Sequence, residues 1–280
     1  MSAPSAPGDD DVEIALEAVQ VDAAAGVGRV VRAGARARGL VDRRVLLGPI
    51  DPCGECDVCR RGGAAVCPHA RRRDALGETA IAAARWLVPL GDGLDVPLPA
   101  AAAVAGDVAT AYTLYARTGV GPREPVVVIG GSPIGRFLIE VLLAKGVQPV
   151  AVAPEGAWAD WLRARGVAVA PDRPALVDAL ARGDHDVRPW RMICADPRAS
   201  ATAIELAGPR ATLTVLARNA AALPGNALAH EITVIGVAGA HPDLVVEAAA
   251  MCVKGEIDVV AGTSVAPDAL CTHVRYVSKA

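Results

Sequence analysis

Short apolar stretches in the first hundred residues alternate with polar or small residues. Val12, Ile14 and Leu16 are separated by acidic or small residues, which is the period of a half-buried strand. A second stretch, GVGRVVRAG, and a third, RRVLLGP, follow with glycine and arginine between them, and ETAIAAARWLVPL resumes the pattern. Short strands with turn residues this dense predict a small β-barrel-like domain.

From Ala100 the pattern changes to longer segments with helical and parallel-strand character. The segment AAAAVAGDVATAYTLYARTGV is rich in alanine and lacks proline, so it predicts a helix that ends near Gly119 or Gly121. Beyond it, the apolar runs VVVIG, VQPVAVAP and VAVAP alternate with the helical segments RFLIEVLLAKG and WADWLRARG, and RMICAD, ATLTVLA and ITVIGVAG supply later strands. This alternation predicts a parallel, doubly wound sheet, and the whole chain is predicted to be an α/β protein.

Composition and charge narrow the classes of function. The chain has 280 residues, of which 52% are hydrophobic and 3% aromatic, so two domains are expected with cores built from alanine, valine and leucine. The net charge of -3 gives no electrostatic footprint for nucleic acid. The amino terminus lacks a basic segment followed by an apolar one, and no stretch reaches the ~18 uninterrupted apolar residues that a membrane span needs. We expect a cytoplasmic protein that binds neither nucleic acid nor a membrane.

A tight group of cysteines lies within DPCGECDVCRRGGAAVC, with the spacing C-x2-C-x2-C-x7-C. Four thiolates this close in a short Gly-rich lobe can close a tetrahedral shell around one Zn2+ and leave no position open for water or substrate, which predicts a structural site. Disulfides are the alternative, although nothing else in the sequence indicates an oxidising compartment. His69 could replace one ligand, and a solvated loop histidine is its simpler interpretation. The cysteines are Cys53, Cys56, Cys59 and Cys67.

A Gly-rich turn follows the apolar run of Val126 to Ile129. Gly130, Ser132 and Gly135 occupy the three positions of a G-x-G-x-x-G turn, with serine at the middle one. The first glycine permits the tight turn, the middle one lets a pyrophosphate approach the backbone, and the third allows the helix to pack closely on the sheet. Because the turn lies between the first parallel strand and the first crossover helix, it favours dinucleotide binding over a plain β-turn-α connection. The Ser132 hydroxyl could donate to the phosphate, or its bulk could weaken binding.

An acidic residue that binds the adenosine ribose is expected about 20 residues after such a turn, at the end of the next strand. Counting from Gly135 leads to Ala153, Pro154 and Glu155, so Glu155 is in range but one position late. No arginine follows immediately to favour a 2'-phosphate, although Arg163 lies on the next helix. The sequence leaves the choice between NAD and NADP open.

Taken together, the cysteine lobe and GGSPIG resemble the zinc-containing alcohol dehydrogenases of the medium-chain dehydrogenase/reductase family. The order of RWLVPLGDGLDVPLP, a helix with TAY, the nucleotide turn and ITVIGVAGAHPDLVVEAAAMCVKGEIDV is similar to that family. The resemblance implies a GroES-like β-barrel domain over residues 1–103 with a zinc lobe at about 49–73, a Rossmann doubly wound sheet over 104–245, and a shortened C-terminal return to the first domain over 246–280. It also implies a homodimer formed through edge strands of the nucleotide domain.

The same resemblance implies roles for particular residues. The four cysteines of the lobe would bind a structural zinc ion, Thr110 would lie near the nicotinamide ring, and Glu155 would take the ribose. The residues that would line the pyrophosphate are Gly130, Ser132, Pro133, Ile134 and Gly135.

The ligands of the family's catalytic zinc are missing from this chain. The family has a cysteine shortly after the first strand and a Gly-His-Glu motif before the next, but here EIALEAVQV passes directly into DAAAGVGRVV, with Asp22 and Ala23 where His and Glu would stand. The third ligand falls on Gly106. Asp107 is adjacent, but one carboxylate without partners cannot hold zinc, so no Lewis acid is expected. We predict one zinc ion per chain.

Three functions remain open at this point, of which the third, a nucleotide sensor, is not separable from the other two by sequence. The first is an oxidoreductase that binds NAD(P)(H) and moves a hydride to or from an activated small-molecule substrate without metal assistance, as zinc-free relatives do when they reduce activated double bonds. Its proton donor would come from Asp107, Thr110 or Tyr112, and no catalytic residue is assigned. The second is a catalytically silent member of the family that serves as a binding or assembly protein.

Overall fold

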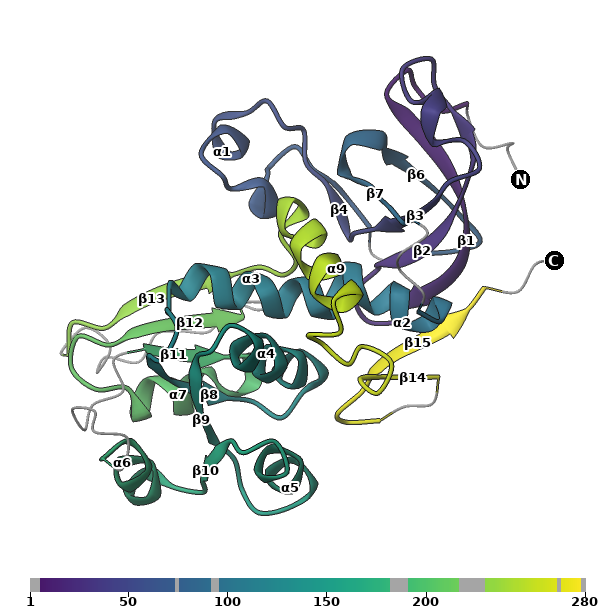
Figure 1. The fold of residues 1–280 in the computed structure, drawn as a ribbon. Coiled ribbons are helices and arrows are strands. Elements are labelled where there is room, and N and C mark those ends of the chain that lie inside the picture. Colours follow the sequence, from purple (N-terminus) through teal and green to yellow (C-terminus); the bar gives the residue numbers. More distant parts are fainter. Residues whose placement is uncertain are drawn as a thin grey trace. The chain divides into compact units, whose positions relative to one another are not determined.

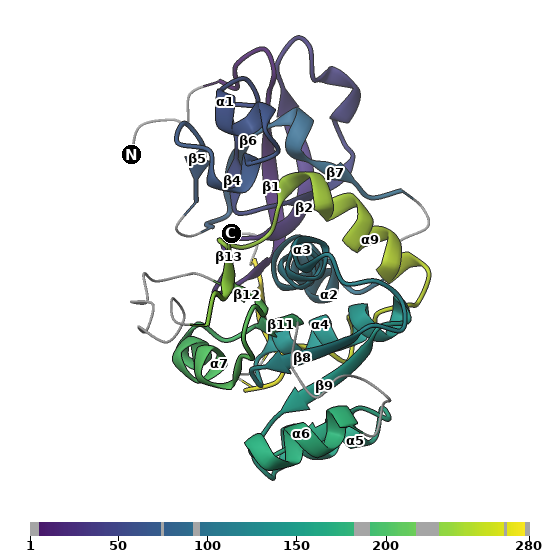
Figure 2. The same cartoon turned by 90° about the vertical axis from the view of Figure 1, so that its left-hand side faces the viewer.

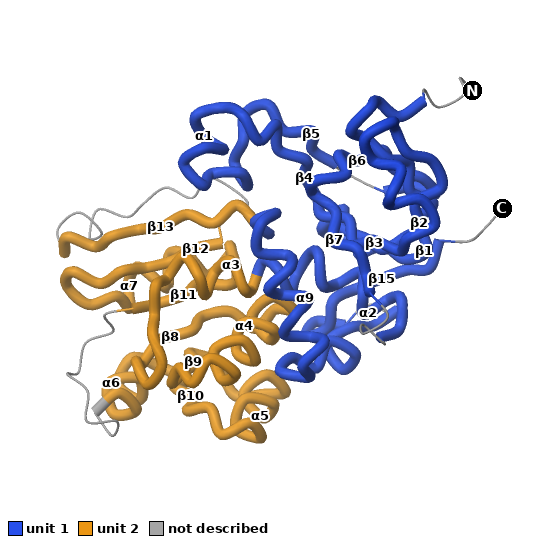
Figure 3. The backbone as a smooth tube through the Cα atoms, turned by 45° about the horizontal axis from the view of Figure 1, so that its top comes forward, with its two compact units in different colours: residues 1–110, 240–280 blue, residues 111–239 orange. Residues whose placement is uncertain are grey.

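The computed structural model describes residues 6–73, 76–91, 96–181, 191–216, 230–265 and 268–277. The chain forms two compact units, the first made of residues 1–110 and 240–280 and the second of residues 111–239 (Figure 3). The first unit holds a curled, mostly antiparallel sheet and the second a parallel sheet with helices, so the α/β fold class predicted from the sequence is confirmed (Figure 1).

The sheet of the first unit has seven strands. In β1 (Asp11–Gln20) the apolar residues Val12, Ile14 and Leu16 are all buried in the core, as their alternation predicts. Glu13 between them is also buried, and it lies opposite Ile81 of β6 and Arg32 of β2, with which it forms an ion pair. The strands run in the order β14-β15-β1-β2-β3-β7, with β6 also paired to β1. They are β2 (Gly26–Ala33), β3 (Arg44–Leu47), β6 (Thr79–Ala83), β7 (Val88–Pro89), β14 (Thr263–Ser264) and β15 (Thr272–Tyr276).

The connection between β1 and β2 is a tight hairpin. The N–H of Gln20 donates to the carbonyl of Ala25 at 2.8 Å, so the chain reverses through a few residues that include Asp22 and Ala23. At this point the family resemblance implies a longer loop that carries metal ligands, whereas this hairpin is too short to form one.

The cysteine lobe is an excursion from the first unit with its own small sheet. Strands β4 (Ile50–Asp51) and β5 (Arg71–Arg72) pair antiparallel at its base, and a helical turn, α1 (Asp57–Arg60), lies within it (Figure 2). Short 3-10 turns occur here and elsewhere in the chain, at Arg38–Leu40, Ala64–Val66, Ala84–Trp86, Pro197–Ala199 and Pro242–Leu244.

The alanine-rich segment forms one continuous helical run, as predicted. It consists of α2 (Leu98–Ala103), a π turn over Val104–Val108 and α3 (Ala109–Thr118). Gly119 ends the run with a φ of 64°, the left-handed conformation common just beyond helix ends. Single π turns inside α-helices are frequent at functional sites, which draws attention to Gly106 and Asp107 within this one.

The C-terminal segment belongs to the first unit. Helix α9 (Val245–Val253) is followed by β14 and β15, and β15 pairs antiparallel with β1, with Ala18 opposite Tyr276. The described residues between α9 and β15 form no helix. No helix among the described parts of the chain is both long and apolar enough to cross a bilayer.

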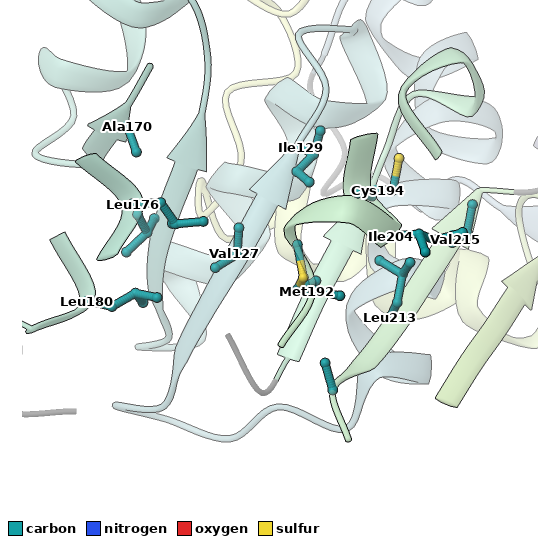
Figure 4. Close-up of a cluster of buried hydrophobic side chains, with 14 residues drawn as sticks. Val127, Ile129, Ala170, Leu176, Leu180, Met192, Cys194, Ile204, Leu213 and Val215 are labelled. Atoms are coloured by element: carbon teal, nitrogen blue, oxygen red, sulfur yellow. The ribbon is translucent and has the colours of Figure 1, made fainter. Parts of the chain in front are cut away.

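The second unit contains a six-stranded parallel sheet in the order β10-β9-β8-β11-β12-β13. Counted along the chain this order is 3-2-1-4-5-6, that of the Rossmann fold. Apolar side chains from the strands and from two helices that the sequence analysis did not single out, α6 and α7, build its core (Figure 4). The strands are β8 (Pro125–Ile129), β9 (Gln148–Val152), β10 (Ala168–Ala170), β11 (Arg191–Cys194), β12 (Thr212–Leu216) and β13 (Thr233–Val237), and the helices are α4 (Pro133–Ala144), α5 (Ala157–Arg163), α6 (Arg173–Ala181) and α7 (Ser200–Leu206).

Candidate functional site

The four cysteines of the lobe bring their sulfur atoms within 4.8 Å of one another. The Sγ atom of Cys53 is 3.6 Å from that of Cys67 and 4.0 Å from that of Cys59. The Sγ atoms of Cys56 and Cys67 are 3.9 Å apart. Four sulfurs at about 2.3 Å from one zinc ion in a tetrahedron lie about 3.8 Å from each other, whereas a disulfide needs about 2.05 Å. The cluster could therefore hold a metal ion, and the exposed His69 is not part of it.

Backbone amides and desolvation act on these thiols in opposite directions. The N–H of Cys56 donates to Cys53 Sγ at 3.4 Å, and that of Cys53 donates to Cys67 Sγ at 3.5 Å. The backbone amides of Glu55 and Cys56 lower the pKa of the Cys53 thiol to about 6. Desolvation and the neighbouring thiols raise the pKa of Cys59 to about 12. The lobe thus favours a first thiolate at Cys53, and a bound cation would have to displace the remaining protons.

The base of the lobe is fixed by a buried ion pair. The Asp51 carboxylate, at 2% exposure, accepts from the guanidinium of Arg73 at 2.6 Å and from the N–H of Ala83 at 3.1 Å. The indole N–H of Trp86 donates to the carbonyl of Pro52 at 2.8 Å, one residue before the first cysteine. These contacts tie the start of the cysteine sequence to the curled sheet.

Gly106 is the position to which the resemblance assigns the third ligand of a catalytic zinc. A Cβ on Gly106 would overlap Oε1 of Gln20 and lie 3.2 Å from the Cβ of Ala25. The Gln20 Oε1 atom accepts from the N–H of Asp107 at 3.2 Å, and Asp107 Oδ2 accepts from the hydroxyl of Thr272 at 2.8 Å. All of these polar groups are buried. The space of a ligand side chain is occupied by the amide of Gln20.

The other candidate proton donors lie on α3. Thr110 is buried, and its hydroxyl donates to the carbonyl of Gly106 at 2.8 Å within the helical run. Tyr112 is half-buried, packs edge-on against Tyr115 with 5.8 Å between ring centroids, and has the ammonium of Lys145 5.7 Å from its own centroid.

The Gly-rich turn lies at the end of β8 and opens helix α4. Gly130 has a φ of 122°, and a Cβ there would come within 2.8 Å of the Asp196 nitrogen, so only glycine suits the first position. A Cβ on Gly135 would overlap the carbonyl oxygen of Gly130, which explains the third glycine. At the middle position the Ser132 Oγ accepts from the N–H of Gly135 at 3.1 Å and caps the helix, with Pro133 at the first helical position.

The turn lies at the point of the sheet where α/β proteins commonly bind ligands. Strand β8 lies between β9 and β11, and the order of strands reverses between β8 and β11. Open α/β sheets bind ligands at the carboxyl ends of the strands next to such a reversal. The amino terminus of the 12-residue helix α4 adds a partial positive charge at the same point.

The residues after β9 form a second cluster close to the turn. Glu155, the expected ribose ligand, pairs with both terminal nitrogens of Arg163 at 2.5 and 2.8 Å, and this guanidinium lowers the pKa of the Glu155 carboxyl. Trp158 lies against the turn itself, because a Cβ on Gly131 would come within 2.9 Å of its Cδ1 atom. In the sequence, Trp158 is predicted only as part of a helical segment, and no pattern there points to a role for it.

Comparisons with known proteins agree on the architecture. No family model matches the chain, and no curated protein matches it. Among solved structures, an alcohol dehydrogenase from Thermus sp. ATN1 is similar with a TM-score of 0.79 and 17% identity, covering 94% of this chain and 87% of that one. A short chain alcohol dehydrogenase from E. coli in complex with NADH is similar with a TM-score of 0.76 and 16% identity, covering 93% of this chain and 85% of that one. A zinc-binding dehydrogenase from Sinorhizobium meliloti bound to NADP is similar with a TM-score of 0.73 and 19% identity, covering 94% of this chain and 86% of that one.

The chain has the fold of the zinc-type alcohol dehydrogenases. The resemblance inferred from the cysteine lobe and the Gly-rich turn is thereby confirmed at the level of the fold. Within this alcohol dehydrogenase fold, the structure brings together the four cysteines and the glycines of the turn that the sequence singled out. It also reveals two side chains that sequence reasoning missed, Gln20 beside Gly106 and Trp158 beside Gly131.

Proposed function

We propose that this chain is an alcohol dehydrogenase-like oxidoreductase that binds NAD(P)(H) and moves a hydride to or from an activated small-molecule substrate without a catalytic zinc ion. The observation that carries the proposal is the Gly130 turn at the end of β8, at the point where the order of the parallel strands reverses. Dinucleotides bind at this point in Rossmann sheets. Two of the similar structures were solved with NADH or NADP, which supports the same ligand class.

The residues of the turn fit a dinucleotide at two of three glycine positions. Gly130 and Gly135 have the close approaches that the motif requires, whereas Ser132 places a side chain where the pyrophosphate would pass. In the proposal Glu155 takes the ribose and Thr110 lies near the nicotinamide, which accepts or delivers the hydride. NAD and NADP both stay open, because the carboxylate of Glu155 and the guanidinium of Arg163 are paired at the ribose position. The pyrophosphate would be held by Gly130, Ser132, Pro133, Ile134 and Gly135.

The proposed absence of a catalytic zinc ion is supported by the neighbourhood of Gly106. A ligand side chain at this position has no space beside Gln20, and the hairpin after β1 has no room for the family's other ligands. Without a Lewis acid, the substrate itself has to stabilise developing charge, as a conjugated double bond can. The catalytic residue is left unassigned.

We further propose one structural Zn2+ per chain in the cysteine lobe, supported by sulfur separations of 3.6 to 4.0 Å. Reduced cysteines that bind zinc accord with the cytoplasm. A homodimer is supported by β13, which ends the parallel sheet and has half-exposed apolar residues at Val234 and Ile235. Two edge strands of this kind can pair across a two-fold axis.

The alternative is a catalytically silent protein of the same fold. It is favoured by the contacts that the turn already makes within the chain. The Ser132 hydroxyl accepts from the N–H of Gly135 at the start of α4, and Trp158 lies against Gly131. In such a protein the nucleotide crevice would be filled by the chain's own side chains.

Calorimetric titration of the full chain with NADH and NADPH distinguishes the two functions. We expect binding of at least one nucleotide, loss of it in Gly135→Ala, whose Cβ would displace the carbonyl of Gly130, and retention in Gly121→Ala, where the nearest atom lies 3.8 Å from the new Cβ. Metal analysis of the same samples should give one zinc per chain. Failure of the wild type to bind either nucleotide at about millimolar concentration would reject the oxidoreductase, and two zinc ions would reject the metal-free mechanism.

A further inference from the structure

Trp158 occupies space directly over the nucleotide turn. Built on Gly131, a Cβ would lie 2.9 Å from Cδ1, 3.1 Å from Cγ and 3.3 Å from Nε1 of this indole, so the ring covers the residue between the first and middle positions of the motif. Both residues belong to the second unit. A pyrophosphate that approaches the backbone of this turn has to share that space with the ring.

The ring is held in place by stacking. Trp158 and Trp161 lie one turn apart on α5 with ring centroids 5.1 Å apart and planes inclined by only 15°. The guanidinium of Arg165 lies 3.8 Å from the centroid of Trp161, and that of Arg136, from α4, lies 5.2 Å from it. Stacked and cation-π contacts of this kind each contribute a modest stabilisation, so the ring has a preferred but not a fixed position.

The start of α5 has few side-chain contacts to hold it in place. Gly156, two residues before Trp158, caps the helix with a φ of 141°, has no side-chain cap, and has nothing within 4 Å of where a Cβ would be. The Glu155 carboxylate beside it is held by Arg163 from the last turn of the same helix. Exposed ion pairs are weak, so a ribose that takes Glu155 can release this link at little cost.

We infer that Trp158 is a gate over the nucleotide turn, whose indole must leave Gly131 before the pyrophosphate of a dinucleotide can bind. The inference rests on the proposed function, since it concerns the same turn. It assigns Trp158 a regulatory role in binding and not a catalytic one. The competing role is a platform on which the adenine stacks, and the two roles predict opposite effects of removing the ring.

Calorimetric titration of the wild type, Trp158→Ala and Trp158→Phe with NADH tests the gate. For Trp158→Ala we expect a Kd about 2- to 12-fold lower than that of the wild type, because the stacked pair no longer has to be broken. Trp158→Phe keeps a ring that can stack on Trp161 and should stay close to the wild type. Circular dichroism establishes that both variants are folded, and ADP used as a second probe isolates the effect on the diphosphate.

Stopped-flow kinetics supply a measurement that a merely structural role would not change. If the ring must move first, the observed rate of NADH binding to the wild type reaches a plateau as the NADH concentration rises, and the plateau disappears in Trp158→Ala. Weaker or unchanged binding in Trp158→Ala, with a wild type that binds NADH, overturns the gate and leaves the proposed function intact. If neither protein binds NADH, the titrations are repeated with NADPH, and failure there as well overturns the gate and the proposed function together.

Discussion

The cysteine lobe and the neighbourhood of Gly106 are the two places in the first unit where the family pattern puts a metal ion, and they have opposite internal chemistry. In the lobe, four sulfur atoms lie within 4.8 Å of one another, and three of their separations are 3.6 to 4.0 Å. At Gly106, the amide oxygen of Gln20 occupies the space that a side chain would take and accepts from the N–H of Asp107, whose carboxylate accepts from the hydroxyl of Thr272. The proposed zinc ion in the lobe and the proposed absence of one at Gly106 therefore rest on separate features of the same unit.

The largest expected effect is the loss of the lobe's metal in Cys67→Ser. Cys67 is the most deeply buried of the four cysteines, at 1% exposure, and a structural zinc site contributes roughly 10–16 kcal/mol of apparent binding free energy in small zinc domains. We expect zinc per chain to fall from one to zero and the lobe to become sensitive to proteases. Cys271→Ser, outside the cluster, should keep its zinc. Equal metal content in the two variants would refute the assignment.

Acid should remove the metal from the lobe. The pKa of Cys53 is lowered from 9.0 to about 6 by the amides of Glu55 and Cys56. The stabilisation that the Cys53 thiolate gives the lobe is therefore fully present above pH 9.0 and is lost as the pH falls through about 6. The pKa of Cys59 is raised to about 12 by desolvation, so zinc has to displace its proton, and affinity also falls in acid. Zinc release to a chromogenic chelator, followed from pH 7 downward, should rise below about pH 6. Full retention about two pH units lower would count against a thiolate site.

The buried ion pair at the base of the lobe should contribute more to the free energy of unfolding than an exposed ion pair elsewhere in the first unit. In Asp51→Ala the guanidinium of Arg73, at 9% exposure, is left buried without its carboxylate, and we expect a loss of about 3–5 kcal/mol in the free energy of unfolding. Asp10→Ala removes an exposed pair with Arg36 on the same unit and serves as the matched control, with little change expected. Urea denaturation of the zinc-loaded proteins measures both. Similar losses in the two variants would show that the buried pair does not anchor the lobe.

The sequence predicted most of the architecture because local patterns determine it. The alternation in β1, the alanine-rich helix ended by Gly119 and the spacing of the cysteines are all short-range signals, and the structure has each of them in place. The parallel sheet likewise follows from apolar runs between helices.

The contacts that change the interpretation of the site were not predictable in the same way. Gln20 and Gly106 are 86 positions apart, and Trp158 lies 27 positions from Gly131, so only the folded chain brings them together. Neither Gln20 nor Trp158 carries a motif of its own. Helices α6 and α7 were missed for a different reason, because their apolar residues are interspersed with proline, alanine and polar residues that give no clear start signal.

The smallest expected effect concerns Gly106, where the Gln20 amide occupies the space of a side chain. Gly106→Cys restores a sulfur ligand at the position given by the resemblance, but its Cβ overlaps Oε1 of Gln20, so we expect a loss of roughly 1–3 kcal/mol in the free energy of unfolding. Truncating the amide in Gln20→Ala/Gly106→Cys should recover part of that loss, which a double-mutant cycle in urea measures as a coupling between the two positions.

The zinc content of the same variants distinguishes a steric clash at position 106 from the ability of this position to bind a second metal ion. Both should still bind one zinc ion per chain, because the hairpin after β1 supplies no further ligands to a lone cysteine at position 106. A second zinc ion in either variant would mean that the site was only blocked by Gln20 and had kept other ligands. Additive effects of the two substitutions, with no coupling, would instead show that Gln20 does not fill the ligand position, and the contrast with the cysteine lobe would then rest on the missing loop alone.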